Sequence, residues 1–129
     1  MNYLLLAAAA AQAFNLNCTG TFNQTFSPIE QFSYTYRVDL AKKKWCSEEC
    51  FRSFDFFEIT PSQLTFEKVT IHVDVDERTF VVASVDRVTG EFRALFITRR
   101  KGWKPISGTW KGQCERAPFT GLPLETRKF

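Results

Sequence analysis

The most suggestive spacing of chemistry-bearing side chains is a histidine followed by two aspartates. His72 is the single histidine of the chain, and Asp74 and Asp76 follow it at every second position. In a strand all three side chains project from one face, where they could hold a divalent cation or form a base oriented by a carboxylate. Residues spaced in this way spread over about 13 Å, however, which is too far to converge on one ion without a bulge. We therefore expect a solvated outer face here, with no catalytic residue, no metal ligand, no cofactor and no enzymatic activity.

A second group of residues combines positive charge with an aromatic ring. Five of them occur in one short connection: Arg99, Arg100, Lys101, Trp103 and Lys104. Such a loop could bind an anion, although an ordinary basic hairpin loop has the same composition. Residues 14–85 carry seven basic and ten acidic groups, whereas residues 86–129 carry ten basic and four acidic groups. The basic C-terminal portion favours an anionic surface as a partner, and the chain has no motif specific for nucleic acid.

The four cysteines predict two disulfides, which can be paired in three ways. We favour Cys18 with Cys114, tying the ends of the domain together, and Cys46 with Cys50 as a local link. By loop-closure entropy, the long disulfide would stabilise the folded protein by about 4.7 kcal/mol and the short one by roughly 2 kcal/mol. Because a disulfide needs Cα atoms within about 7 Å, the second pairing requires a turn, or one turn of helix, at residues 45–51.

Residues 1–13 have the pattern of a short signal peptide. An apolar run of leucine and alanine, residues 4–10, precedes Ala11-Gln12-Ala13, which fits an A-x-A cleavage site. The run is too short for a transmembrane segment, which needs about 20 apolar residues. We therefore expect cleavage after Ala13, a mature single domain over residues 14–129, and a periplasmic or secreted location.

Most of the remaining sequence alternates between apolar and polar residues, as half-buried strands do. The clearest case is Gln31–Leu40, in which Phe32, Tyr34 and Tyr36 share one face. Further strands are predicted at residues 54–60, 69–75, 79–87, 91–99 and 108–115. Leu64 and Phe66 lie on the opposite parity from Val69 and its successors, which predicts a bulge or tight turn near Glu67-Lys68.

These strands add up to an all-β domain of about seven short strands, arranged as a small antiparallel barrel or sandwich. Residues 79–87 and 91–99 form a predicted hairpin joined through Val88-Thr89-Gly90, in which glycine supplies a positive φ. Consecutive hairpins favour an up-and-down meander, so we prefer the barrel. The tail from Arg116 contains two prolines and a glycine and is expected to be irregular.

Aromatic residues are abundant enough to line a ligand cavity. The chain has fourteen phenylalanines, and five of them are candidates for an apolar cavity of lipocalin type: Phe22, Phe26, Phe54, Phe56 and Phe57. Ordinary core packing accounts for them as well and is the commoner case. The first place to look for a cavity is behind the face formed by Phe32, Tyr34 and Tyr36.

Three segments of the mature chain resemble small, uncharacterised exported proteins of proteobacteria. They are Leu16-Asn17-Cys18-Thr19-Gly20-Thr21, Asp86-Arg87-Val88-Thr89-Gly90, and Gly112-Gln113-Cys114-Glu115 followed by Ala117-Pro118-Phe119. The resemblance implies a periplasmic β-domain without an assigned activity, so it transfers no functional residue. A weaker similarity links the chain to periplasmic lysozyme inhibitors, which are small disulfide-closed β-barrels ending in a cysteine-bearing strand.

The expected function is therefore that of a non-enzymatic exported β-domain that acts by binding or by structural association. Its partner would be another periplasmic protein or an anionic surface. Two alternatives remain: an inhibitor of a cell-wall hydrolase or protease, and a carrier of a small apolar ligand.

Overall fold

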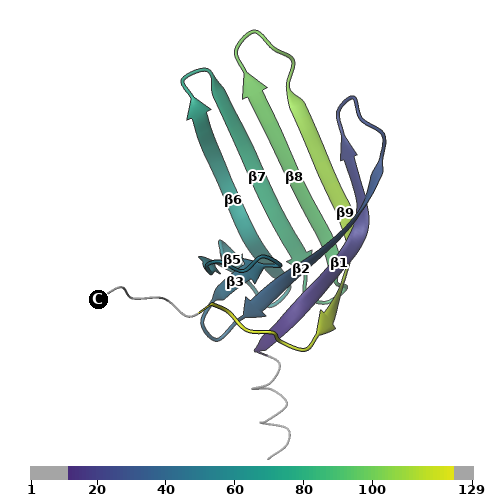
Figure 1. Cartoon of the computed structure of the whole chain (residues 1–129), viewed down its shortest axis with the longest axis vertical. Coiled ribbons are helices and arrows are strands. Elements are labelled where there is room, and N and C mark those ends of the chain that lie inside the picture. Colours follow the sequence, from purple (N-terminus) through teal and green to yellow (C-terminus); the bar gives the residue numbers. More distant parts are fainter. Residues whose placement is uncertain (1–11, 124–129) are drawn as a thin grey trace, which may run out of the picture.

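The computed structural model describes residues 12–123, which form one curled antiparallel sheet (Figure 1). Its nine strands are β1 (Ala13–Gln24), β2 (Glu30–Asp39), β3 (Lys44–Ser47), β4 (Phe54–Asp55), β5 (Glu58–Ile59), β6 (Gln63–Asp74), β7 (Glu77–Asp86), β8 (Glu91–Arg100) and β9 (Ile106–Ala117). The predicted all-β antiparallel class is confirmed, but the expected number of about seven strands is too low. The expected leader, residues 1–13, lies outside the described residues except for Gln12 and Ala13.

Two observed strands match no predicted range: β1, which has twelve residues and lies at the centre of the sheet, and β3, which is short. The stretch 54–60 was expected as one strand but forms β4 and β5, each of two residues, on either side of Phe56-Phe57. β3 has four residues and includes Cys46 of the local disulfide. Apolar and polar residues cannot establish a period of two over so few positions.

The sheet is neither a closed barrel nor a sandwich but a half-barrel. Its strand order is β4-β3-β2-β1-β9-β8-β7-β6-β5, a meander in which the first long strand pairs with the last. β4 and β5 form its two opposite edges, although only Phe56 and Phe57 separate them in the chain. The sheet must therefore curl until its edges approach each other at this end. Beyond this end β2 and β6 are not bridged, because β3, β4 and β5 have only four, two and two residues (Figure 1).

Backbone hydrogen bonds attach this short segment to both edges of the sheet. The Phe56 N–H donates to the carbonyl of Lys43 at 3.3 Å, and the Phe57 N–H donates to the carbonyl of Thr65 at 2.9 Å. The segment thus closes the end of the half-barrel at which the core lies.

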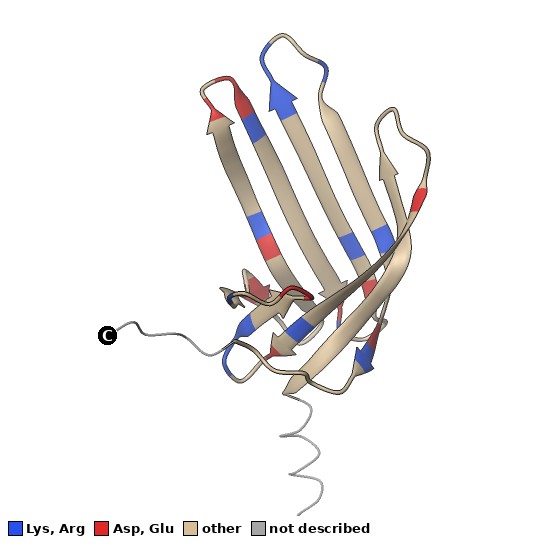
Figure 2. Cartoon of the chain, in the orientation of Figure 1, with Lys and Arg blue, Asp and Glu red and all other residues tan. Residues whose placement is uncertain are grey.

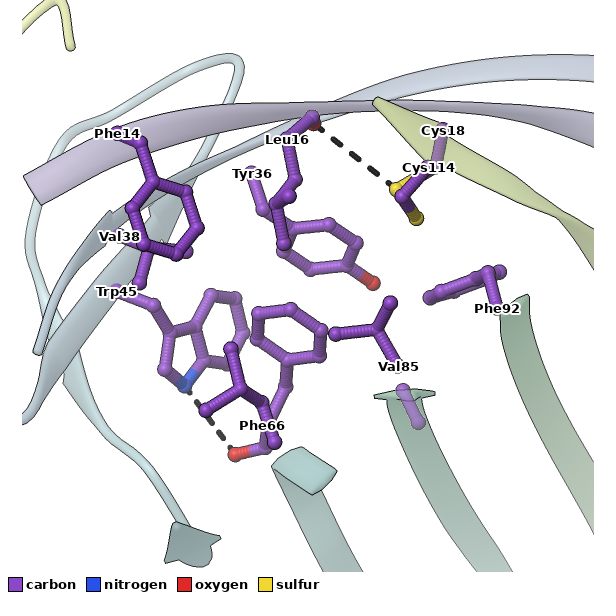
Figure 3. Packing of buried hydrophobic residues seen from close by; sticks show 12 residues of the cluster. Phe14, Leu16, Cys18, Tyr36, Val38, Trp45, Phe66, Val85, Phe92 and Cys114 are labelled. Carbon is purple, nitrogen blue, oxygen red and sulfur yellow. Dashed lines mark hydrogen bonds between the residues drawn. A yellow bond between two sulfur atoms is a disulfide. The ribbon is translucent and has the colours of Figure 1, made fainter. Parts of the chain in front are cut away.

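The core consists of aromatic and aliphatic side chains packed inside this closed end. The ring of Tyr36 stacks on that of Phe66 with centroids 3.9 Å apart (Figure 3). The indole N–H of Trp45 donates to the Phe66 carbonyl at 3.2 Å, so this buried polar group is satisfied. Full burial of a side chain such as Leu64 or Phe66 stabilises the fold by about 1.5–3 kcal/mol.

β6 contains the bulge that the change of parity predicted. Its register with β7 shifts between Thr65 and Glu67, where Phe66 is the extra residue. Phe66 is buried in the core, and Glu67 next to it lies opposite Ala83, a residue of the inner face. The bulge thus turns two consecutive side chains of β6 toward the inside of the half-barrel.

Both disulfides connect the favoured cysteine pairs. Cys18 on β1 lies directly opposite Cys114 on β9, so this bond joins the first long strand to the last. Cys46 and Cys50 are bonded across a bend that follows β3, with Cα atoms 5.4 Å apart. Two disulfides are typical of proteins that fold in an oxidising compartment. In the described range no helix is long and apolar enough to cross a membrane.

The predicted hairpin between β7 and β8 is also confirmed. The Asp86 carboxylate accepts hydrogen bonds from the N–H groups of Val88 at 2.8 Å and Thr89 at 2.9 Å. Gly90 then adopts a φ of 78°, which an L-residue with a side chain rarely tolerates. These interactions set the register in which β8 returns along β7.

Candidate functional site

A cavity of about 240 Å³ opens on the inner face of the half-barrel, beside the core. Its lining residues come from five strands: Phe32, Ser33, Tyr34, Tyr36, Glu67, Val81, Ala83, Phe92, Ala94 and Trp110. The cavity thus lies behind the face of Phe32, Tyr34 and Tyr36, the first place at which the sequence suggested looking for one.

β2 supplies one wall of the cavity through three alternate residues. Tyr36 lies deepest, packed between the core and the cavity, and Figure 3 shows its hydroxyl on the side of Phe92. The Tyr34 ring meets that of Tyr36 edge-on at 4.8 Å, and the ring of Phe32 is 5.8 Å from that of Phe92. Tyr34 and Phe32 are only half buried, so part of each ring is free to contact a ligand.

The opposite wall owes its hollow to two alanines. Ala83 on β7 lies directly opposite Ala94 on β8, and Ala94 lies opposite Trp110 on β9. Two methyl groups therefore occupy positions at which the neighbouring rows carry larger side chains. The space that they leave is bounded by Phe92 on one side and Trp110 on the other.

One carboxyl group lies in this otherwise apolar and aromatic cavity. Glu67 is half buried, and burial raises its pKa above the ordinary value of 4.5. Burial also raises the pKa of Tyr36, with smaller contributions from Tyr34 and Glu67, which places these three groups within electrostatic reach of one another. No Lys or Arg is among the described residues that line the cavity.

Beyond the cavity, the inner face becomes more exposed and carries several apolar side chains. Val69 and Ile71 on β6 are 42% and 49% exposed. The row of Val69 continues through Val81 and Phe96, whereas Thr79 and Thr98 lie between Ile71 and Ile106 in the next row. We call these five apolar residues the concave apolar face. Exposed apolar side chains grouped in this way mark an interaction site more often than a single exposed residue does.

The five phenylalanines proposed as cavity lining do not line it. Phe22 on β1 lies on the inner face directly opposite Trp110, and its ring stacks on that of Trp110 at 4.4 Å, next to the cavity lining. Phe54 packs on Trp45 at 5.0 Å and Phe56 packs on Phe66 at 5.3 Å, so both belong to the closed end. Phe26 is 87% exposed in a turn, and Phe57 is also largely exposed.

The basic connection lies at the tip of the β8–β9 hairpin (Figure 2), and none of its five residues lines the cavity. Arg99, Arg100, Lys101 and Trp103 share a shallow depression of about 460 Å³ with the β6–β7 turn, whereas Lys104 does not line it. The Arg100 guanidinium lies 5.5 Å from the Trp103 ring centre.

Acidic groups also line this depression, and their negative charges reduce the electrostatic attraction that its basic residues offer to an anion. Asp76 and Glu77 come from the β6–β7 turn, and Glu77 lies directly opposite Arg100. Anion binding at this tip stays a prediction.

His72, Asp74 and Asp76 are not gathered as metal ligands in the described part of the chain, although His72 and Asp76 line the depression at the hairpin tips. All three are exposed, and the Asp74 carboxylate accepts the N–H of Asp76 within the turn at 3.1 Å. Across residues 12–123 no group of three or more His, Cys, Asp or Glu side chains is placed to hold a metal ion.

Seven lining residues escaped the sequence reasoning: Ser33, Glu67, Val81, Ala83, Phe92, Ala94 and Trp110. Only Glu67 left a signal, since the parity change at Glu67-Lys68 located the bulge that turns it inward. The two alanines and Trp110 meet through pairings between strands, which local patterns do not reveal. Comparison with family models, curated proteins and solved structures found no match to this chain.

Proposed function

We propose that the protein is an exported binding domain that carries a small apolar ligand on the inner face of its half-barrel. The observation that carries this proposal is the aromatic cavity of about 240 Å³ and its continuation onto the concave apolar face. A cavity of about 150 Å³ holds benzene, and drug-sized ligands occupy about 300–1,000 Å³. The cavity would therefore take a ring or a branched group, and the rest of the ligand would lie along the exposed face.

A periplasmic or secreted location is part of the same proposal. The leader pattern of residues 1–13 and the two disulfides support it, because disulfides persist in oxidising compartments. An apolar molecule in such a compartment needs a protein that shields it from water.

The proposal is tested with N-phenyl-1-naphthylamine, a neutral apolar probe whose fluorescence rises when it leaves water. We expect saturable binding of one probe per chain. Ala94→Leu adds a side chain to the cavity wall and should weaken binding at least about tenfold. Thr70→Leu adds a similar side chain on the opposite face of β6, where Thr70 is exposed and lies outside the cavity, and should bind as the original does.

Two results would overturn the carrier hypothesis. One is the absence of saturable binding by protein whose circular dichroism shows a folded sheet. The other is equal affinity of the Ala94→Leu and Thr70→Leu variants. Sedimentation of the same samples must show a monomer, since a dimer that covers the concave apolar face would point to structural association instead.

A further inference from the structure

We propose that the ligand is an organic cation, with its ammonium group held among the aromatic rings beside Glu67 and its apolar body on the concave apolar face. This inference rests on the proposed function and names the chemical class of ligand. It is carried by the composition of the cavity wall, in which a single carboxyl-bearing residue lines the same space as five aromatic rings.

The first argument is the charge of the cavity. Glu67 is the only ionisable carboxyl or basic group among the described lining residues. It takes part in no ion pair with any residue of the 12–123 range. A half-buried carboxylate without a cation is unfavourable, because it loses hydration without gaining an opposite charge. A cationic ligand would supply that missing charge.

The second argument is the placement of the aromatic rings. Phe32, Tyr34 and Tyr36 form the wall on β2, while Phe92 and Trp110 stand on the facing strands β8 and β9. A cation between these walls would contact the negatively polarised faces of rings from two sides. Attraction of this kind reaches about 2 kcal/mol or more per desolvated ring, and it is the usual means of binding quaternary ammonium groups.

The third argument concerns the ligands that the cavity disfavours. A fatty acid or another organic anion would bring its charge next to Glu67 with no Lys or Arg in the described lining to compensate. The raised pKa of Glu67 is consistent with a carboxyl group that lacks a cation. A neutral apolar molecule could enter, but it would leave the carboxylate unpaired.

The test compares two compounds of nearly the same shape, phenyltrimethylammonium and tert-butylbenzene, in which a carbon atom replaces the charged nitrogen. Each displaces N-phenyl-1-naphthylamine from the full chain, and the concentration that displaces half of the probe is measured. We expect the cation to bind at least about tenfold more tightly than its neutral counterpart.

Two variants of cavity residues, with one control, test whether the preference for the cation arises in the cavity. Glu67→Gln keeps the shape of the side chain and should abolish the difference between the two compounds. Tyr34→Leu removes a half-buried ring and should lower the affinity for the cation more than the affinity for the neutral compound. Glu115→Gln removes the same charge from an exposed position of β9 outside the cavity and should keep the full preference.

The outcomes separate this inference from the proposed function. Displacement by both compounds with equal affinity would overturn the cation inference and leave the carrier function standing. A preference that persists in Glu67→Gln would overturn the role given to Glu67. If the probe itself fails to bind, both proposals fall together.

Discussion

A carboxyl group in an aromatic cavity is a local cost to folding that a single substitution can measure. Burial raises the pKa of Glu67, so the folded protein holds this proton more tightly than the unfolded chain does. The free energy of unfolding must then fall as the pH rises from the unfolded pKa through the higher folded pKa. Above the folded pKa the loss is complete and stays constant.

Glu67→Gln should therefore raise the melting temperature at neutral pH and flatten the pH dependence of stability above about pH 4.5. The gain should vanish in acid, where both states of the original protein carry a protonated carboxyl. Thermal unfolding followed by circular dichroism across this pH range checks it. Glu115→Gln is the matched control, and a Glu67→Gln variant less stable than the original at neutral pH would contradict the argument.

At the scale of elements, β1 and β9 approach each other through a pair of glycines. Gly20 lies directly opposite Gly112, two residues from the Cys18–Cys114 pair. A Cβ at Gly20 would overlap the carbonyl oxygen of Lys111, and one at Gly112 would overlap that of Thr19. These contacts are with backbone atoms, which cannot rotate away as a side chain can.

Gly112→Ala should destabilise the protein by about 1–3 kcal/mol, as other cases of overpacking do. The added methyl group would also press on Phe32, whose ring lies 3.0 Å from its position, so binding of the apolar probe should weaken as well. Urea unfolding measures the first effect and probe titration the second. Thr21→Ser, at an exposed position of β1, serves as control; equal stability of the two variants would show that the strands can separate without cost.

At the scale of the whole molecule, the half-barrel depends on two links between distant parts of the chain. The Cys18–Cys114 disulfide spans 96 positions and joins the first and last long strands, whereas Cys46–Cys50 spans only four. The segment between β4 and β5 holds the two edges of the sheet near each other at the closed end.

Removal of the long disulfide by Cys18→Ala with Cys114→Ala should lower the free energy of unfolding by about 4.7 kcal/mol, and removal of the short one by about 2 kcal/mol. The difference arises because a disulfide that closes a longer loop removes more conformational entropy from the unfolded chain. Urea unfolding of both double variants under identical conditions provides the measurement. Equal losses, or a larger loss from the Cys46–Cys50 pair, would be inconsistent with this account.

The candidate site was predictable only in part. The alternation of Phe32, Tyr34 and Tyr36 located the wall on β2, because side chains two apart in a strand share a face. The opposite wall was not predictable, since Ala94 and Trp110 become neighbours only through the register of β8 with β9. None of the five candidate phenylalanines lines the cavity, and Phe56 instead packs against the core, which was the other interpretation of these residues. Residue type alone does not distinguish a cavity wall from a packed core.

The sequence by itself determined features that depend on local spacing: most of the long strands other than β1, the bulge at Glu67 and the β7–β8 hairpin. Each of these follows from the geometry of a few consecutive residues. The tertiary structure alone decided that the sheet stays open as a half-barrel and that a carboxyl group faces an aromatic cavity. Those features arise from contacts such as Tyr36 with Phe66, which lie thirty positions apart and meet only when the whole sheet has curled.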